Sequence, residues 1–304
     1  MPITMLLGAG VLTKFVFSQM HMGVSVRLTL FSTSQAQASS AAERAFTRFR
    51  DLDSLMSDYQ NASELSQLNR SQGQLFRVSD DVMRVLVKAR TLSIETDGMF
   101  DITVGPSVKL WRLARSSRQL PTDQEIAQAR SFVGMQHVFL MPAAQQVRLL
   151  NPAVRLDLGG IAKGYACEQA VRQTQLAGVR SAMIEAGGDI YVSAAPPLER
   201  GWKIAIEGTK RTVEVSHSAV STSGSTVQFV EIGGARYSHI VDPRTGVGLR
   251  TLRQVTTIGK DGAMVDALAT AFCIEPTLQK RFRGVRVFIT ERRELSSDES
   301  STLR

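Results

Sequence analysis

The sequence contains little cysteine: two residues in 304, Cys167 and Cys273. Both lie in apolar patterns typical of helices, where a free cysteine usually packs as a small buried hydrophobic residue. Their number and spacing predict no disulfide framework, and they form no set with histidines that matches a zinc site. These absences exclude a small domain that depends on disulfides or on structural zinc.

Long hydrophobic runs are absent as well. The most apolar stretch, MPITMLLGAGVLTKFVF at the N-terminus, is interrupted by Lys14 after 13 residues, whereas a helix that spans a bilayer needs about 20. The stretch also lacks a basic n-region, so for residues 1–19 we favour a first strand, with a degenerate signal peptide as the alternative. The cellular compartment is not determined by this segment.

Runs of basic residues with interleaved aromatics are missing too. Aromatic residues make up 6% of the chain, while the net charge is +8. Such an excess favours anionic partners, namely phosphates, anionic lipid or nucleic acid. Because no basic and aromatic run appears, we expect no nucleic-acid binding. A solvated basic surface explains the charge equally well.

What is present is a mixture of strand and helix patterns without regular βαβ alternation, which favours the α+β class. Residues 23–31 alternate like a half-buried strand, and residues 42–56 place apolar side chains at helical spacing. Further helices are expected at 79–98, 121–134, 161–178 and 262–274. Further strands are expected at 137–141, 146–150, 154–157, 181–192, 202–208, 213–224, 227–241, 254–259 and 285–290.

No long Pro- or Ser-rich linker divides the chain. We therefore expect a single domain over residues 20–290, built of two closely packed lobes of mixed sheets and helices. Residues 291–304 are polar and are expected to be a disordered tail.

The stretch DLGGIAKGYACEQA (157–170) joins a strand, ending at Asp157, to a helix. Gly159 and Gly160 allow a tight turn and a close approach of the backbone to a ligand. The first amides of the helix attract an anion, and Lys163 adds a positive charge there. The spacing fits neither a Walker A loop nor GxGxxG, and taken alone such a turn is more often structural.

The stretch VDALATA (265–271) places Asp266 and Thr270 four residues apart, on one face of a helix. A carboxylate and a hydroxyl are hard oxygen ligands, which suit Mg²⁺ together with water and substrate phosphates. The alternative makes Asp266 an acid near the helix N-terminus, after Asp261 and Gly262, with Thr270 bonded to a helix carbonyl. By themselves the residues slightly favour this alternative.

Weaker signals occur elsewhere. Phe100 and Asp101, in TDGMFDITVGP, could hold a flat ring or form a capped turn over the core. Tyr59 follows a helix end and could stack on a ligand or cover the core. AGGD (186–189) and STSG (221–224) add glycine turns and hydroxyls, and YSHIVDPRTG (237–246) carries a histidine into a tight turn. Together these features suit a pyrophosphate-bearing ligand with Mg²⁺.

The order of these motifs, from MSDYQNASEL through TDGMFDITVGP, DLGGIAKGY, AGGD, STSG and YSHIVDPRTG to VDALATA, resembles the FAD:protein FMN transferases, the ApbE family. The resemblance covers roughly residues 20–290. It implies an α+β protein with an FAD cleft between packed lobes. It also implies an Mg²⁺-dependent enzyme that moves FMN from FAD to a Thr or Ser hydroxyl of a partner protein through a phosphoester bond and releases AMP.

The resemblance assigns roles to particular positions. His239 would assist deprotonation of the acceptor hydroxyl, since histidine titrates near neutrality. Asp266 is the second residue expected to be catalytic. The expected metal site is formed by Gly160, through its carbonyl, with Asp266 and Thr270. The expected FAD contacts are Met22, Tyr59, Met99, Phe100, Asp101, Asp157, Lys163 and Ile240.

The sequence also departs from the family pattern. Met-Gly-Thr is MGV here, STVQF follows the TSG motif in place of an aromatic and basic run, and the C-terminal end is short. Ala269 stands where some members carry a second carboxylate, so we expect weaker metal binding. Two other functions stay open: an FAD pyrophosphatase that gives FMN and AMP, and a non-catalytic flavin-binding protein.

The expected partners are FAD and an acceptor protein with a Thr or Ser flavinylation motif, through which membrane association could arise. The resemblance implies a periplasmic or membrane-associated location, and a real lack of a signal peptide would imply a cytoplasmic one.

Overall fold

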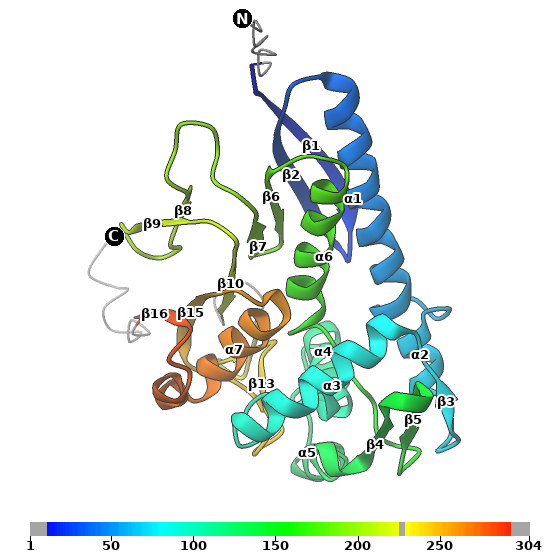
Figure 1. The fold of residues 1–304 in the computed structure, drawn as a ribbon. Helices are drawn as coiled ribbons and strands as arrows, with labels where there is room; N and C mark the ends of the chain where they lie inside the picture. The colour runs from blue at the N-terminus through cyan, green and yellow to red at the C-terminus, as the bar shows by residue number, and fades with distance from the viewer. Residues whose placement is uncertain (1–10, 225–228, 293–304) are drawn as a thin grey trace, which may run out of the picture.

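The computed structural model of the chain describes residues 11–224 and 229–292. Its central feature is a seven-stranded sheet in the order β1-β2-β6-β7-β10-β15-β16, in which every neighbouring pair is antiparallel (Figure 1). The strands are β1 (Thr13–His21), β2 (Val24–Ser32), β6 (Ser181–Ala186), β7 (Asp189–Val192), β10 (Ser218–Gly224), β15 (Leu252–Gly259) and β16 (Arg286–Arg292).

Three helices pack on one face of this sheet: α1 (Gln35–Met56), α6 (Ala162–Leu176) and α7 (Gly262–Ile274). Helix α6 packs against both of the others. The alternation of β2 explains the arrangement, because Leu28 and Leu30 join the large core beneath the helices, whereas Phe31 points to the opposite face.

The opposite face carries a second, smaller core. The hairpin of β8 (Trp202–Ala205) and β9 (Thr212–Val215) covers it, and the ring of Trp202 lies 5.9 Å from that of Phe31 between centroids. The middle of the sheet is thus covered on both faces, which fixes the register there, whereas the edge strand β1 is largely exposed.

The remaining elements lie below the central sheet in Figure 1. They comprise a small three-stranded sheet, four helices and two further hairpins. These elements are β3 (Phe76–Arg77), β4 (Val138–Met141), β5 (Gln146–Leu149), α2 (Glu64–Asn69), α3 (Asp80–Glu95), α4 (Gly105–Ser117), α5 (Asp123–Arg130), β11 (Phe229–Ile232), β12 (Ala235–Ser238), β13 (Val241–Asp242) and β14 (Val247–Gly248), with short 3₁₀ turns at Ile102–Val104, Met135–His137, Pro142–Ala144 and Pro276–Arg281. The α+β prediction is confirmed.

The helix ends follow the predicted signals. Ser79 caps α3 by accepting from the amide of Val82, and beyond its last turn Gly98 has φ +77° and donates to the carbonyl of Ser93 at 2.7 Å. Gly178, with φ +82°, follows α6 in the same way. The paired glycines at 233–234 turn β11 into β12, as the sequence predicts.

Several details of the chain differ from expectation, among them α2 and β3, which were not predicted. Residues 154–157 form no strand, so Asp157 does not end one; instead its amide donates to the carbonyl of Ile102 at 2.7 Å. Val154 and Leu156 are nonetheless fully buried, which explains the strand-like alternation. Helix α4 was not expected. Its first two residues, Gly105 and Pro106, end the TDGMFDITVGP motif and suggest a loop.

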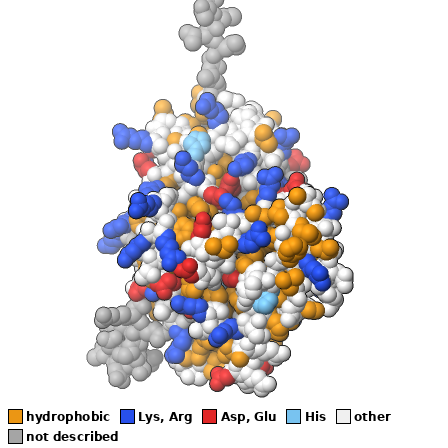
Figure 2. All heavy atoms as spheres, turned by 60° about the horizontal axis from the view of Figure 1, so that its bottom comes forward, with side chains coloured by type: hydrophobic (Ala, Val, Ile, Leu, Met, Phe, Trp, Pro, Cys, Tyr) orange, Lys and Arg blue, Asp and Glu red, His pale blue; other side chains and the backbone are white. Residues whose placement is uncertain are grey.

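Other expectations concern the ends of the chain. Thr13–His21 forms β1, whereas residues 1–10 and 293–304 lie outside the described residues, as does the STVQ segment at 225–228. Among the described residues, no helix is both long and apolar enough to cross a membrane. Figure 2 shows Lys and Arg side chains dispersed over one face and interspersed with acidic ones.

Candidate functional site

One large cavity, of about 910 Å³, draws its walls from segments between Met22 and Ile274. All twelve site residues expected from the sequence lie on its walls. They are Met22, Tyr59, Met99, Phe100, Asp101, Asp157, Gly160, Lys163, His239, Ile240, Asp266 and Thr270. The structure therefore brings together residues from six separate stretches of chain.

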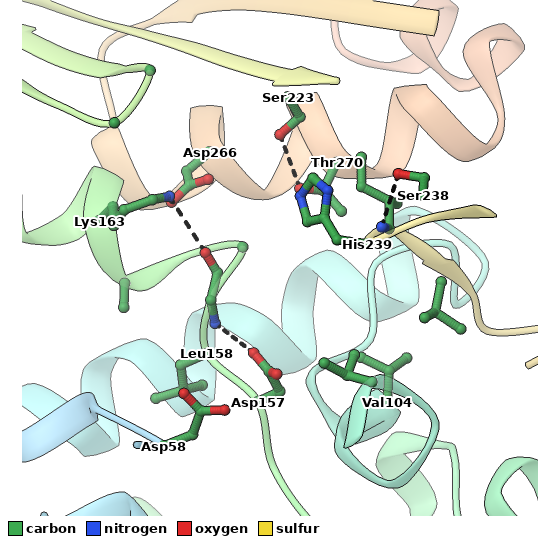
Figure 3. A pocket seen from close by; sticks show the side chains of 18 of the residues that line it. Asp58, Val104, Asp157, Leu158, Lys163, Ser223, Ser238, His239, Asp266 and Thr270 are labelled. Carbon is green, nitrogen blue, oxygen red and sulfur yellow. Dashed lines mark hydrogen bonds and ion pairs between the residues drawn. The ribbon is translucent and has the colours of Figure 1, made fainter. Parts of the chain in front are cut away.

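Helix α7 supplies one corner of the cavity. Asp266 and Thr270 are one turn apart on it, and the Oδ2 atom of Asp266 accepts from the amide of Gly164 at 3.0 Å. The Oγ1 atom of Thr270 lies 3.1 Å from Oγ of Ser223 on β10 (Figure 3). A Cβ atom added to Gly160 would lie 3.2 Å from the same Thr270 oxygen, so the backbone at Gly160 approaches it closely.

This geometry bears on the two interpretations of α7. The helix is capped by Asp261, whose Oδ1 accepts from the amide of Met264 at 2.9 Å, so Asp266 has no capping role. Asp266 is 2% exposed and faces the cavity corner. Its carboxylate therefore lies on the cavity wall and does not cap the helix.

Lys163 lies in the same corner, in the first turn of α6. Its Nζ atom is 2.7 Å from Oδ2 of Asp189 and 3.9 Å from Oδ2 of Asp266. Burial raises the pKa of Asp266, and the nearby charge of Asp189 raises it further, to about 7, against the opposing effect of Lys163. Burial disfavours the charge of Lys163, but Asp189 and Asp266 outweigh it, so the pKa of Lys163 stays above its ordinary value.

These residues could hold a hard divalent cation only with help from a ligand. Among the residues that the structure describes, no group of three or more His, Cys, Asp or Glu side chains could hold a metal by itself. The available donors are one carboxylate, one hydroxyl and peptide carbonyls, which are the types that Mg²⁺ accepts alongside substrate phosphates. A buried carboxylate whose charge is incompletely compensated fits such a cation.

A second cluster surrounds Asp157. Arg112 of α4 donates to Oδ2 of Asp157 at 3.0 Å and also to Asp58, and its guanidinium stacks 4.6 Å from the ring centre of Tyr59. The other oxygen of Asp157 accepts from the amide of Gly159 at 2.8 Å (Figure 3). Burial and then Asp58 raise the pKa of Asp157, while Arg112 opposes them. Tyr59 is 75% exposed, so its ring is available at the rim to stack on a ligand.

The turn that follows α3 forms an apolar wall of the cavity with Met99 and Phe100, both largely buried. The carboxylate of Asp101 caps the short 3₁₀ turn Ile102–Val104, accepting from the amide and hydroxyl of Thr103 at 2.8 and 2.5 Å. Asp101 therefore caps a turn, which is one of the two roles that the sequence suggested for it.

Met22 lies in the two-residue turn between β1 and β2, where its φ is +48° and that of Gly23 is +71°. The amide of Met22 donates to Oδ2 of Asp53 on α1 at 3.0 Å. A non-glycine residue in the left-handed region is uncommon, and here the bond to α1 holds it in place.

His239 follows β12 and is exposed, with its ring pointing toward the Ser223–Thr270 pair in Figure 3. Ile240, next to it, is buried and donates its amide to Oγ of Ser238 at 3.1 Å.

The Asp-Pro-Arg-Thr-Gly turn stabilises itself: Arg244 pairs with Asp242 at 2.8 Å, and Gly246 accepts from the indole of Trp111 at 2.8 Å. The carboxylate and guanidinium of this turn bond to each other and hold its shape, and neither is among the residues that line the cavity.

Four residues of the site were given no role from the sequence: Asp58, Arg112, Asp189 and Ser223. Asp189 and Ser223 fall in the AGGD and STSG motifs, where the acid and the hydroxyl themselves were the signal. Arg112 lies on the unexpected helix α4, and nothing in its local pattern sets it apart from other helix-surface arginines.

A family model described as "ApbE family" matches residues 22–282. The chain belongs to the ApbE family. The FAD:protein FMN transferase of Vibrio cholerae serotype O1 is 32% identical to it over 235 residues, which are 74% of this chain and 70% of the relative.

Solved structures of the ApbE family share the fold. The apo form of Pseudomonas stutzeri flavinyl transferase ApbE matches with a TM-score of 0.83 and 27% identity, over 93% of this chain and 92% of that one. The flavin transferase ApbE from Vibrio cholerae matches with a TM-score of 0.81 and 27% identity, over 95% and 99%.

Proposed function

We propose that this ApbE-family chain is an FAD:protein FMN transferase, which moves FMN from FAD to a Thr or Ser hydroxyl of an acceptor protein. The acceptor oxygen forms a bond to the FMN-side phosphorus, the bond from that phosphorus to the AMP oxygen breaks, and AMP leaves. The observation that carries the proposal is the meeting of all twelve expected residues on one cavity of about 910 Å³. The printed names of the relatives support it.

We assign the resident cation as Mg²⁺, with the Asp266 carboxylate, the Thr270 hydroxyl and the Gly160 carbonyl as its protein ligands. When bound, the cation neutralises charge on the pyrophosphate. Asp266 suits this role because it is buried, faces the cavity and has a single neutral donor, the amide of Gly164, at 3.0 Å.

Other residues bind and orient the two halves of FAD. Lys163, whose ammonium lies on the cavity wall, offers positive charge to phosphate oxygens. Arg112 holds Tyr59 and Asp157 in fixed positions at the rim, where a ring can stack and a hydroxyl or amine can donate. Met99 and Phe100 add an apolar wall. His239, exposed and directed into the cavity, takes the proton of the acceptor hydroxyl.

The exposure of His239 also favours one alternative, because water can reach the position of the acceptor hydroxyl. Water in that role would make the protein an FAD pyrophosphatase that releases FMN and AMP.

The test is incubation of the protein with FAD and MgCl₂, with and without a peptide carrying a Thr flavinylation motif, followed by mass spectrometry. FMN attached to the peptide, with one AMP released per transfer, is the expected result. Free FMN in both reactions would support the pyrophosphatase instead, and unchanged FAD would leave only flavin binding.

Variants sharpen this test. Asp266→Asn should lower the transfer rate at least about 100-fold, the scale on which one electrostatic group contributes to catalysis, while circular dichroism shows an unchanged fold. Asp123→Asn removes an exposed carboxylate on α5, away from the cavity, and should transfer at the wild-type rate. Equal rates for the two variants would contradict the cation assignment.

A further inference from the structure

A buried acid lies directly behind the cavity. Asp189 is 3% exposed, begins β7 and is not among the residues that line the cavity. Its Oδ2 atom is 2.7 Å from Nζ of Lys163, and its Oδ1 atom accepts from the hydroxyl of Ser221. The carboxylate is therefore held on both oxygens.

The backbone fixes the position of this acid. Gly187 and Gly188 form the two-residue turn between β6 and β7, with φ of +57° and +99°, both in the left-handed region. A Cβ atom at Gly187 would lie 2.8 Å from a methyl of Val24, so the turn is packed as well as constrained. Asp189 cannot follow Lys163 if the lysine moves.

We propose that Asp189 is the positioning residue of the cation site: it holds the Lys163 ammonium away from Asp266, so that Asp266 remains available to the divalent cation. This inference rests on the cation site of the proposed function. The ammonium is within hydrogen-bond distance of Asp189, at 2.7 Å, but not of Asp266, at 3.9 Å.

The charges of the corner support this assignment. Two buried carboxylates around one ammonium leave a net negative charge, which attracts a cation. Without Asp189, the nearest carboxylate to the ammonium is that of Asp266, about one ångström beyond hydrogen-bond distance, and the flexible lysine stem allows that move. The resulting Lys163–Asp266 pair would be neutral, and a cation would have to displace the lysine.

Cation binding by the protein alone tests this without measuring activity. Mn²⁺ takes the same oxygen ligands as Mg²⁺, and its free concentration can be followed by electron paramagnetic resonance. The proteins to compare are the wild type, Asp189→Asn, Lys163→Met and the double variant, with Asp266→Asn identifying the site by its loss.

We expect Asp189→Asn to weaken Mn²⁺ binding at least 10-fold and Lys163→Met to bind at least as tightly as the wild type. In the Lys163→Met background, the effect of Asp189→Asn should fall below 3-fold, because no ammonium is left to compete. The same factor in both backgrounds would mean that Asp189 acts only as a distant negative charge and would overturn the proposal. No effect of Asp189→Asn in the wild-type background would overturn it too.

A second variant covers the case in which Asp189→Asn does not fold. Ser221→Ala keeps the charge of Asp189 but removes the hydroxyl that fixes its Oδ1 atom. It should weaken Mn²⁺ binding about 3-fold with Lys163 present and leave it unchanged in Lys163→Met; equal effects would count against the proposal. If the variants bind Mn²⁺ as expected but the protein transfers no FMN, the proposed function is wrong and the positioning role stands. If the protein transfers FMN but the effect of Asp189→Asn on Mn²⁺ binding does not depend on Lys163, the positioning role is wrong and the proposed function stands.

Discussion

At the scale of single residues, three buried carboxylates differ in what satisfies them. Asp101 receives hydrogen bonds from the amide and hydroxyl of Thr103, within its own turn. Asp189 has an ammonium and a hydroxyl. Asp266 has one amide, and the ammonium of Lys163 stays 3.9 Å away. Because an incompletely satisfied buried charge is costly, Asp266 is the one of these three carboxylates that a cation would compensate.

Asp81 offers a residue-scale prediction about pH. It accepts from Arg48 at 2.9 and 2.5 Å and from the hydroxyl of Tyr165 at 2.6 Å. Burial raises its pKa, but the hydrogen bonds from Arg48 and Tyr165 outweigh burial and lower the pKa below its ordinary value. A lowered pKa in the folded state means that the ionised group stabilises the fold fully above the unfolded pKa of about 4, and that this contribution is lost as the pH falls from there through the lowered pKa of the folded state.

We therefore expect Asp81→Asn to reduce the free energy of unfolding by about 2 kcal/mol at pH 7, the scale of hydrogen bonds to a charged group. At pH 3 the difference from the wild type should be smaller, because the pH has fallen below the unfolded pKa, as measured by urea denaturation at both values. Asp80→Asn removes the same charge from the neighbouring, exposed position of the same helix turn and should cost about 0.5 kcal/mol. A loss for Asp81→Asn that is the same at both pH values would contradict the charge-based explanation.

At the scale of elements, the crossing of α6 and α7 determines where Asp266 lies. A Cβ atom on Gly164 would lie 2.1 Å from the carbonyl oxygen of Gly262, and one on Gly262 would lie 2.2 Å from that of Gly164. The two glycines let the helix backbones touch, and this contact presents the amide of Gly164 to Asp266.

The sequence predicts such elements better than it predicts their contacts. Helix α7 spans residues 262–274 as expected, because its cap and its apolar run are local signals. The close approach at Gly164 is not visible locally, because a glycine inside a helical pattern shows only that a side chain is missing. The prediction that Asp157 ends a strand failed because it too depended on a contact that the local pattern does not show. Alternate residues before Asp157 are buried, as in a strand, but no described strand pairs with them.

We predict that Gly164→Ala lowers the free energy of unfolding by about 1–3 kcal/mol, the cost of overpacking. In an exposed helix the same substitution would stabilise by about 1 kcal/mol, so a loss in thermal or urea denaturation reports the clash. Gly284→Ala is the matched control, because no atom lies within 4 Å of the added Cβ, and we expect a change within about 0.5 kcal/mol. An unchanged or more stable Gly164→Ala protein would show that the helices can separate freely.

At the scale of the whole molecule, the cavity belongs to no single segment. Its walls include the β1–β2 turn, the C-terminal side of α1, the turn before α4, the start of α6, the end of β10, the β12–β13 connection and α7. The order of motifs along the sequence predicted which stretches take part. Their convergence depends on the sheet order β2-β6-β7-β10-β15, which places strands distant in sequence side by side and which no local pattern encodes.

A ligand that contacts all of these segments should stabilise the whole fold. At 100 times its dissociation constant, FAD with Mg²⁺ should contribute about 2.7 kcal/mol and raise Tm by about 5 °C in a fluorescence melt. AMP and FMN each reach part of the cavity, so each alone should raise Tm less. Asp266→Asn should keep the shift caused by AMP but lose the increment that Mg²⁺ adds with FAD, because the rim around Tyr59 and Asp157 stays intact. If FMN alone matched FAD with Mg²⁺, the dinucleotide would not span the cavity.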